Sequence, residues 1–335
     1  MTTECKQKMR AIVITKSGDP GVLKLGDAPT PSPQKGEVRV KIKATAVNRA
    51  DLLQRKGQYP PPADVLQDVP GLEFAGVVDM IGEGSSDWSV GDRVFGLCGG
   101  GSYAEYVVVH SRTLARIPDK LTFAEAAAIP EVFITAYDAL VTQMQLAPGD
   151  WTLINAVGSG VGTAAVQIVK AFGGKSIGTS RNAEKLTKAT EFGLSEGILA
   201  SDGKFADRVM ELTGGKGVDV VLELNGGAYV TEDLRCMAPK GRLTVVGLVA
   251  GASANVDLAR ILSRRLQIRG TTLRMRPLEE KIAATIVFSR QVVPLFENGT
   301  LKPVLDVQFP LERAAEAHEY VESDKNFGKV VLVID

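Results

Sequence analysis

The chain has 335 residues, 44% of them hydrophobic and 23% charged, and its 39 basic side chains balance its 39 acidic ones. This composition is typical of a globular protein and excludes a disordered or strongly charged chain. Nucleic acid is not an expected partner, because its binding needs an excess of basic side chains. The most basic stretch, residues 260–270, is interpreted as a solvated helix end.

Targeting signals and cysteines also limit the possibilities. No stretch approaches the roughly 18 apolar residues of a membrane span, and the opening MTTECKQKMR lacks the apolar centre of a secretory signal. The three cysteines, Cys5, Cys98 and Cys236, are far apart and odd in number, so they form no disulfide framework or zinc-binding spacing. We therefore expect a cytoplasmic protein in which Cys98 and Cys236 only fill space.

The first third of the chain has the pattern of a β-rich domain. Between residues 37 and 47 apolar and polar side chains alternate, which predicts a strand with one buried face. Segments rich in proline and glycine, at 29–36, 58–65 and 96–102, lie around it. Short strands between such breaks indicate a compact and largely antiparallel sheet.

Between Trp151 and Leu273 apolar strands alternate with helix-length segments. The predicted strands cover residues 151–156, 175–180, 197–201, 218–224, 242–249 and 266–273. This alternation predicts a doubly wound parallel sheet with helices on both faces, which is the α/β arrangement of a Rossmann domain.

The rest of the chain has the pattern of a helical stretch after Glu279, followed by a strand, a helix and a last strand. We expect this tail to rejoin the β-rich domain, because the Rossmann domain is complete without it. The predicted division is therefore residues 1–130 with 297–335 for the β-rich domain, and residues 131–296 for the Rossmann domain.

A turn of small residues lies between the first Rossmann strand and its helix, in "NAVGSGVGTAAVQIVKAFGG" (155–174). A helix start offers unpaired N–H groups and a positive dipole end, so a pyrophosphate fits there if no Cβ blocks its approach. The strict pattern G-x-G-x-x-G fails at Thr163, but the looser A-x-x-S-x-x-G fits. The residues expected at a dinucleotide are Ala156, Gly158, Ser159, Gly160, Val161 and Gly162. The alternative is a tight turn without a ligand.

The end of the second Rossmann strand distinguishes the two nicotinamide dinucleotides. An acidic residue there accepts a hydrogen bond from the ribose of NAD. This chain instead has Ser180 and Arg181, with Lys185 one turn later. A hydroxyl and two cations suit a 2′-phosphate and predict NADPH as the cofactor. The alternative is that Arg181 and Lys185 form a solvated helix start.

Several segments along the chain carry a family resemblance. They are "AVNRADLLQRKGQYPPP" (46–62), "PGLEFAGVV" (70–78), "VGDRVFGL" (90–97), "LTFAEAAAIPEVFITAYDAL" (121–140), "SGVGTAAVQI" (159–168) and "NFGKVVLVI" (326–334). Together they resemble the zinc-free quinone oxidoreductases of the medium-chain dehydrogenase/reductase superfamily, in the branch with the tumour-suppressor-inducible NADPH:quinone oxidoreductases and the zeta-crystallins. The resemblance implies a GroES-like β-rich catalytic domain, a Rossmann domain, and a homodimer that pairs through the edge strand near 266–274.

Zinc-dependent members of this superfamily carry a cysteine near the "NRAD" segment and a Gly-His-Glu sequence. Here Asn48 and Leu72 stand at these places, and "GLCGGGSYAEY" has one cysteine where the zinc enzymes have a four-cysteine lobe. Leucine cannot bind zinc and asparagine is a poor ligand for it. We therefore predict no metal site, and we interpret Glu73 as a hydrogen-bonding residue between strands.

The resemblance implies that the protein positions NADPH against an electron-poor acceptor, since hydride transfer is the chemistry of the cofactor. Quinones are the expected acceptors, and α,β-unsaturated carbonyl compounds are the alternative. A third possibility is a crystallin-like protein that binds NADPH without turnover. Asn48 is expected to hold the carboxamide or a substrate oxygen through its donor and acceptor groups. Tyr59 is expected to stack on a ring and donate a hydrogen bond.

Other cofactor residues also follow from the resemblance. Asn225, Gly247 and Leu248 are expected near the nicotinamide, at the carboxyl ends of their strands. Arg274 is expected near the adenine-phosphate end, or in an ion pair at a subunit contact, and Asn326 at the last wall of the cleft. Relatives often have a tyrosine after the third Rossmann strand, where this chain reads "GILASDGKF" with Ala200 and Ser201.

Overall fold

The computed structural model describes residues 7–335. The chain forms two compact units, which we name the split unit (residues up to Ile134, with Leu273–Asp335) and the central unit (Thr135–Thr272). The chain leaves the split unit four residues later than predicted and returns to it at residue 273 instead of 297.

The early return has a clear physical reason, because the helices after Leu273 pack against the β-rich sheet. These helices are α9 (Leu278–Val287), η4 (Phe288–Val292) and α10 (Val293–Glu297). The Phe288 ring lies 5.6 Å from that of Phe95, and the Phe296 ring lies 4.7 Å from that of Phe133. Amphipathic spacing shows that such a segment is helical, but it does not show which sheet the apolar face covers.

The central unit has a six-stranded sheet of parallel strands. In spatial order the strands are β10 (Glu196–Leu199), β9 (Lys175–Ser180), β8 (Trp151–Ile154), β11 (Val218–Glu223), β12 (Met237–Val245) and β13 (Gln267–Gly270). The strand order reverses between β8 and β11, and the carboxyl ends of strands at such a reversal form the usual ligand site of doubly wound sheets. The predicted Rossmann fold is confirmed.

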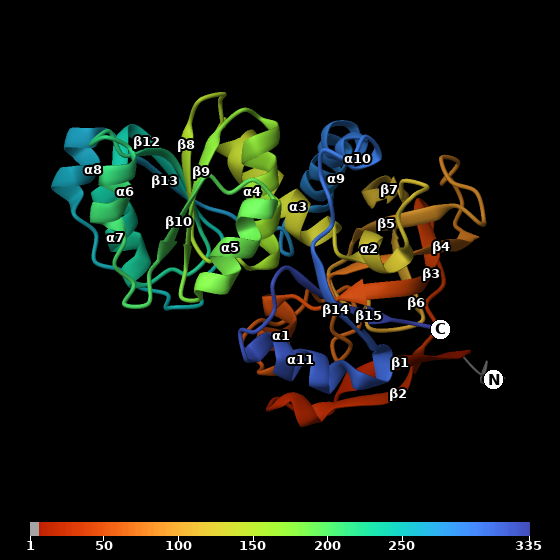
Figure 1. Ribbon diagram of the computed structural model, residues 1–335. Coiled ribbons are helices and arrows are strands. Elements are labelled where there is room, and N and C mark those ends of the chain that lie inside the picture. Colours follow the sequence, from red (N-terminus) through yellow and green to blue (C-terminus); the bar gives the residue numbers. More distant parts are fainter. Residues whose placement is uncertain (1–6) are drawn as a thin grey trace. The chain divides into compact units, whose positions relative to one another are not determined.

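Helices cover both faces of this sheet, as Figure 1 shows. One face carries α4 (Gly160–Ala171) and α5 (Ala183–Glu191). The other carries α6 (Ala206–Leu212), α7 (Ala228–Cys236) and α8 (Leu258–Arg264). Double coverage explains why β8 and β11 are buried almost throughout. The edge strand β13 remains exposed along its length.

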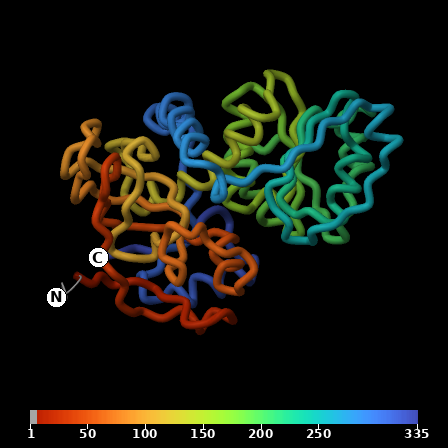
Figure 2. The backbone as a smooth tube through the Cα atoms, turned by 180° about the vertical axis from the view of Figure 1, so that it is seen from behind, coloured from red at the N-terminus to blue at the C-terminus, as the bar shows by residue number. Residues whose placement is uncertain are grey.

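The split unit has a second, mostly antiparallel sheet. In spatial order its strands are β14 (Leu305–Pro310), β15 (Lys329–Val333), β3 (Glu37–Ala46), β4 (Glu73–Ile81), β5 (Arg93–Leu97) and β7 (Leu114–Arg116), with β6 (Tyr106–His110) also paired to β3. The prediction that the tail rejoins this domain is confirmed, because Val331 in β15 lies opposite Ala46 in β3. Figure 2 shows the blue tail returning among the red and orange strands.

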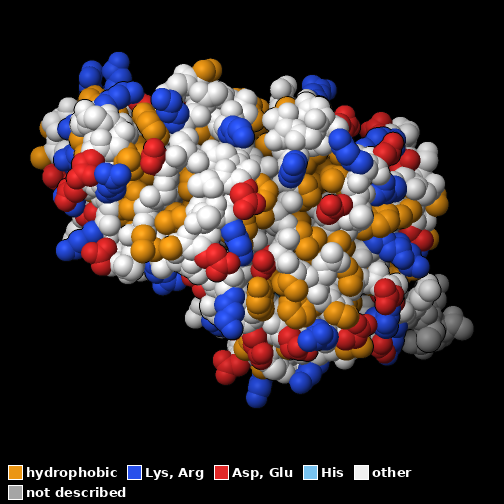
Figure 3. Space-filling view, viewed as in Figure 1, with side chains coloured by type: hydrophobic (Ala, Val, Ile, Leu, Met, Phe, Trp, Pro, Cys, Tyr) orange, Lys and Arg blue, Asp and Glu red, His pale blue; other side chains and the backbone are white. Residues whose placement is uncertain are grey.

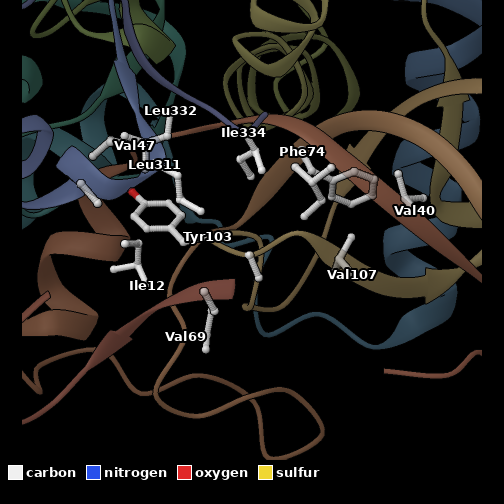
Figure 4. Packing of buried hydrophobic residues seen from close by; sticks show 14 of the residues in the cluster. Ile12, Val40, Val47, Val69, Phe74, Tyr103, Val107, Leu311, Leu332 and Ile334 are labelled. Atoms are coloured by element: carbon white, nitrogen blue, oxygen red, sulfur yellow. The ribbon is translucent and has the colours of Figure 1, made fainter. Parts of the chain in front are cut away.

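Smaller elements complete the split unit. They are β1 (Lys8–Ile14), η1 (Pro20–Val22), β2 (Leu23–Pro29), α1 (Arg49–Arg55), η2 (Ser111–Thr113), α2 (Phe123–Ala127), η5 (Leu311–Arg313) and α11 (Ala314–Glu322). Helix α3 (Pro130–Tyr137) contains the boundary between the units and continues as a π-type turn, η3 (Asp138–Gln143). In Figure 4 the Tyr103 ring lies among Leu311, Val47 and Ile12 in the core of this unit.

The strand with one buried face that was predicted at 37–47 is present as β3. Its apolar residues Val38, Val40, Ile42 and Ala44 are fully buried. On the outside, Figure 3 shows acidic and basic side chains interspersed over the viewed face, in agreement with the zero net charge. Within residues 7–335 no helix is both long and apolar enough to cross a membrane.

Candidate functional site

The glycine turn of the central unit has the geometry of an anion-binding helix start. Ser159 caps α4, and its Oγ accepts a hydrogen bond of 3.1 Å from the N–H of Gly162. A Cβ on Gly162 would lie 2.6 Å from the carbonyl oxygens of both Ala156 and Val157, so only glycine fits. The first N–H groups of a helix have no backbone partner within it, and the small residues here add little bulk around them. The turn therefore fits a pyrophosphate.

The residues predicted for a 2′-phosphate lie around this turn. The side chain of Lys185 crosses it so closely that a Cβ on Gly158 would lie 2.7 Å from the lysine Cδ. Ser180 is the last residue of β9, and its Oγ accepts a hydrogen bond of 3.1 Å from the N–H of Asn182. Arg181 follows on the surface. Lys185 thus lies against the turn, and Ser180 and Arg181 follow the neighbouring strand β9, so the residue types present suit a phosphate.

Sequence reasoning missed an aromatic residue near the place where relatives have their tyrosine. Tyr229, at the start of α7, packs its ring 5.6 Å from that of Phe205 and 3.8 Å from the position of a Cβ on Gly203. The charge of Arg181 acts on its hydroxyl, although burial dominates and raises the pKa of Tyr229. A tyrosine at the start of the helix that follows β11 thus lies beside the segment after Ala200 and Ser201. No local signal links residues 201 and 229.

A buried polar network lies beneath the carboxyl ends of β8, β9 and β11. Asn155 Nδ2 donates to the carboxylates of both Glu223 and Asp233, and Thr179 Oγ1 donates to Asn155 Oδ1 over 2.7 Å. Burial, followed by the charge of Glu223 and a hydrogen bond with it, raises the pKa of Asp233 well above its usual range. Two adjacent buried carboxyl groups cannot both be charged, so Asp233 keeps its proton.

The same Glu223 carboxylate fixes the loop after β11. It accepts hydrogen bonds from the N–H groups of Asn225 and Gly226, and the Asn225 carbonyl accepts one of 2.6 Å from the N–H of Ala250. The loops after β11 and β12 are therefore joined. Gly247 packs against the Leu224 carbonyl, and Leu248 is 55% exposed. The structure brings the three predicted nicotinamide residues to the same edge of the sheet.

In the split unit, Asn48 belongs to a closed and buried hydrogen-bond network. Lys329 Nζ donates to Asn48 Oδ1 over 2.6 Å and to the Val47 carbonyl over 2.9 Å, and it forms a 2.8 Å ion pair with Glu73. Asn48 Nδ2 in turn donates to Glu73 Oε1 over 2.8 Å and to the Ala46 carbonyl over 3.2 Å. Both N–H bonds of the Asn48 amide are thus occupied, so its predicted role as a donor to a ligand does not fit this geometry.

Asp51 connects this network to a second one. Its carboxylate accepts hydrogen bonds from the N–H groups of Asn48 and Gly71, while burial raises its pKa to about 6. Tyr103 Oη lies 3.5 Å from Asp51 and 3.1 Å from His318 Nε2. Burial and the charge of Arg55 lower the pKa of His318 to about 3, so the imidazole is neutral at physiological pH. These hydrogen bonds stabilise the buried residues next to Asn48.

Arg274 and Tyr59 form a pair. The Arg274 guanidinium lies 5.1 Å from the centroid of the Tyr59 ring and donates to the Tyr59 carbonyl, to the Gly99 carbonyl and to Gln54 Oε1. These contacts lie within the split unit, and they favour a role beside Tyr59 over the expected one at the adenine phosphate or a subunit contact. Asn326 is half-buried between α11 and β15, where its Nδ2 donates to the Gly328 carbonyl over 2.9 Å.

Glu131 also borders this network and was missed in the sequence. It is the second residue of α3, and its N–H donates to Glu73 Oε2 over 2.8 Å. Burial, followed by the charge of Glu73, raises the pKa of Glu131 to about 8. Its carboxyl group is therefore protonated at neutral pH. The "AAAIPEVFITAY" segment carries the family resemblance but gives no sign of this ionisation state.

The residues that stand at the zinc positions of related enzymes are non-ligating. Leu72 is buried, and Asn48 faces the ammonium group of Lys329. In the part of the chain from residue 7 onward, no three His, Cys, Asp or Glu side chains come together as a metal site would require. Cys98 is half-buried and donates to the Gly71 carbonyl, Cys236 is buried, and Cys5 lies outside the described residues.

Comparisons with known proteins agree with this geometry. Residues 34–119 match the family model of the alcohol dehydrogenase GroES-like domain, and residues 160–288 match that of the zinc-binding dehydrogenases. Human quinone oxidoreductase is 32% identical over 97% of this chain and 98% of its own length.

Two solved structures extend the comparison. A quinone oxidoreductase of Pseudomonas syringae pv. Tomato DC3000 is 30% identical with a TM-score of 0.85, covering 97% of this chain and 100% of that one. The JamJ enoyl reductase is 26% identical with a TM-score of 0.88, covering 98% of this chain and 100% of that one.

The GroES-like and Rossmann units together define an oxidoreductase of the medium-chain dehydrogenase/reductase superfamily, whose members use NAD(H) or NADP(H). Within it, the chain belongs to the quinone oxidoreductase family.

Proposed function

We propose that this protein reduces quinones with a hydride from NADPH and needs no metal. The observation that carries this conclusion is the helix start at 156–162, where Ser159 caps the turn and Lys185 crosses it. A capped turn of small residues with Lys185 against it suits a phosphorylated dinucleotide. Such a ligand supplies the hydride when it is bound.

The cofactor-binding residues are proposed to act in three groups along the carboxyl edge of the central sheet. The turn from Ala156 to Gly162 holds the pyrophosphate, and Ser180, Arg181 and Lys185 hold the 2′-phosphate. Tyr229 takes the place of the aromatic residue that is missing at Ala200. The joined loops at Asn225 and Gly247–Leu248 support the nicotinamide.

The acceptor is proposed to be a quinone, because the split unit offers positioning rather than Lewis-acid activation. Lys329 and Glu73 hold the Asn48 amide in one orientation, with both of its N–H bonds already donated. Arg274 supports Tyr59, which stacks on the acceptor ring. A quinone is electron-poor without a metal, so orientation against the hydride donor is sufficient.

A steady-state assay of NADPH oxidation with 9,10-phenanthrenequinone, 1,2-naphthoquinone and an alkenal tests this function. Turnover with the quinones supports it. Turnover with the alkenal alone favours an enoyl or alkenal reductase, which is the second candidate because the JamJ enoyl reductase has such a similar structure. Tight NADPH binding without any turnover favours a crystallin-like binding protein.

We further propose that the protein forms a homodimer through β13. This edge strand is exposed, and next to it Leu258 and Leu262 on α8 are 73% and 80% exposed. Pairing two copies of β13 covers both the unpaired strand edge and these leucines. Light scattering should give twice the mass of the chain, and Leu262→Glu should give the monomer mass.

A further inference from the structure

We propose that Glu131 is the proton donor of the reaction, which protonates an oxygen of the acceptor when the hydride is transferred. Because this role rests on the proposed function, it concerns the same acceptor site in the split unit. Three properties of Glu131 support this role, namely its place beside Glu73, the ionisation of its carboxyl group and the lack of a hydrogen-bond partner for that group among residues 7–335.

The position follows from the hydrogen bonds of Glu73. One oxygen of the Glu73 carboxylate accepts from the Glu131 N–H, and the other accepts from Asn48 Nδ2, each over 2.8 Å. A single carboxylate thus separates Glu131 from Asn48. Arg274, which stacks on Tyr59, also acts electrostatically on Glu131. The backbone of Glu131 therefore shares the Glu73 carboxylate with Asn48, and the charge of Arg274, which contacts Tyr59, acts on the Glu131 carboxyl group.

The charges around Glu131 come from four different elements. Glu73 on β4 and Asp51 on α1 favour the protonated acid, whereas Lys329 on β15 and Arg274 after β13 favour the carboxylate. The start of α3 also favours a carboxylate. Burial and the Glu73 charge outweigh these effects, so the pKa of Glu131 rises to about 8. Lys329 is the strongest of the opposing charges, although it also forms an ion pair with Glu73.

Glu131 differs from its neighbours in having an unoccupied carboxyl group. The Asn48 amide, the Lys329 ammonium and the Glu73 carboxylate satisfy one another. Among residues 7–335, by contrast, the Glu131 side chain has no hydrogen-bond partner, and only its backbone N–H donates to Glu73. The side chain is half-buried. A partly accessible acid whose O–H has no protein acceptor is available to a ligand.

The acceptor gains a hydride, with its electron pair, and becomes the hydroquinone anion. The O–H bond of Glu131 breaks, and its proton forms the O–H bond of the neutral hydroquinone. The Glu131 carboxylate then regains a proton from solvent through its accessible side. General acids with a pKa near the working pH are the most effective, and a value of about 8 meets this condition.

The first test needs no cofactor or acceptor. Infrared spectra of wild-type protein and Glu131→Gln are compared at about pH 6 and about pH 10, on either side of the expected pKa of about 8. The carboxylic-acid band that the variant lacks should be present at the lower pH and absent at the higher one. Exposed Glu280→Gln is the matched control, and it should lose no such band. A carboxylate band for Glu131 at the lower pH would overturn the proposal.

The second test measures turnover of a quinone. Glu131→Gln should lower kcat by about 100-fold or more, and it should abolish the solvent deuterium isotope effect. In the wild-type protein kcat should fall as the pH rises through about 8, and this fall should be absent in the variant. The Glu131→Asp variant should recover part of the rate, and Glu280→Gln should match wild type.

The outcomes separate this proposal from the proposed function. If wild type oxidises NADPH with quinones, and Glu131→Gln has the same kcat and pH profile, only the role of Glu131 fails. If wild-type protein turns over no acceptor at all, the proposed function fails and the role of Glu131 fails with it.

Discussion

The two units solve the same electrostatic problem in different ways. In the split unit, the buried Glu73 carboxylate forms an ion pair with Lys329. In the central unit, the buried Glu223 carboxylate has Asp233 beside it, and within residues 7–335 its donors are the neutral Asn155 and backbone N–H groups. There the second carboxyl group remains protonated.

This difference predicts which substitutions should lower the stability of each unit most. A buried ion pair is strongly destabilised when one partner is removed, because the other charge is left uncompensated. A carboxyl pair that shares a proton tolerates a neutral amide in place of its protonated member, and it loses stability when the charged member is replaced. The loss of unfolding free energy caused by a substitution should therefore differ between the two networks, both in its size and in its dependence on pH.

The largest effect is expected for Lys329→Met, which leaves the Glu73 charge buried without its partner. The loss of unfolding free energy should be about 3–5 kcal/mol, measured by denaturant titration. The double variant Lys329→Met, Glu73→Gln removes both charges and should recover much of this loss. A single variant within about 1 kcal/mol of wild type would show that the pair is not needed.

A smaller effect is expected in the carboxyl network of the central unit. Glu223→Gln should cost about 2 kcal/mol, because the N–H groups of Asn225 and Gly226 lose a charged acceptor. Asp233→Asn should cost less. Since Asp233 binds its proton more tightly in the folded state, wild-type stability falls relative to this variant as the pH rises above about 4. Equal losses for both variants at every pH would contradict a shared proton.

Cofactor preference should change when the cation and hydroxyl beside the turn are replaced. The double variant Ser180→Asp, Arg181→Ala should shift preference from NADPH toward NADH by at least about 1.4 kcal/mol, or tenfold. The ratio of the two dissociation constants, obtained by calorimetry, measures this shift. An unchanged ratio would remove both residues from the 2′-phosphate site.

Arg274→Gln should have a modest effect, because it removes the cation behind Tyr59 and keeps some hydrogen bonding. We expect KM for the quinone to rise by about threefold to tenfold, in line with roughly 1 kcal/mol for a cation–π contact, with a smaller change in kcat. Unchanged NADPH affinity would agree with the contacts seen in the split unit. A loss of NADPH affinity alone would restore the role at the adenine phosphate.

No effect is expected from metal removal. Prolonged treatment with a strong chelator should leave kcat and KM unchanged, because Leu72 and Asn48 replace the zinc ligands of related enzymes. Activity that is lost on chelation and restored by zinc would contradict the metal-free mechanism.

Local patterns made much of the fold predictable. Strand alternation in β3 and the strand-turn-helix order at residues 151–171 follow from short-range periodicity, and both are present in the structure. The return of the chain at Leu273 was not predictable, because the apolar face of α9 has the same spacing whichever sheet it covers.

The sequence yields a site hypothesis where the residues concerned lie in one segment. The turn at 156–162 is such a segment, and so is Ser180–Lys185, and the cofactor roles proposed for both stay predictions. The Asn48–Lys329 contact joins residues 281 positions apart. Because of such contacts the Asn48 amide already has hydrogen-bond partners within the protein, which its place in the sequence does not reveal. Tyr229 and Glu131 were missed for a similar reason, since burial and distant charges determine their roles.

Calorimetric titration of the wild-type protein with NADPH, NADP⁺, NADH and NAD⁺ tests the central claim most directly. One site per chain for NADPH, with at least about tenfold weaker binding of NADH, is the predicted result. The absence of binding for all four dinucleotides would contradict the assignment of the helix start at 156–162 as a cofactor site.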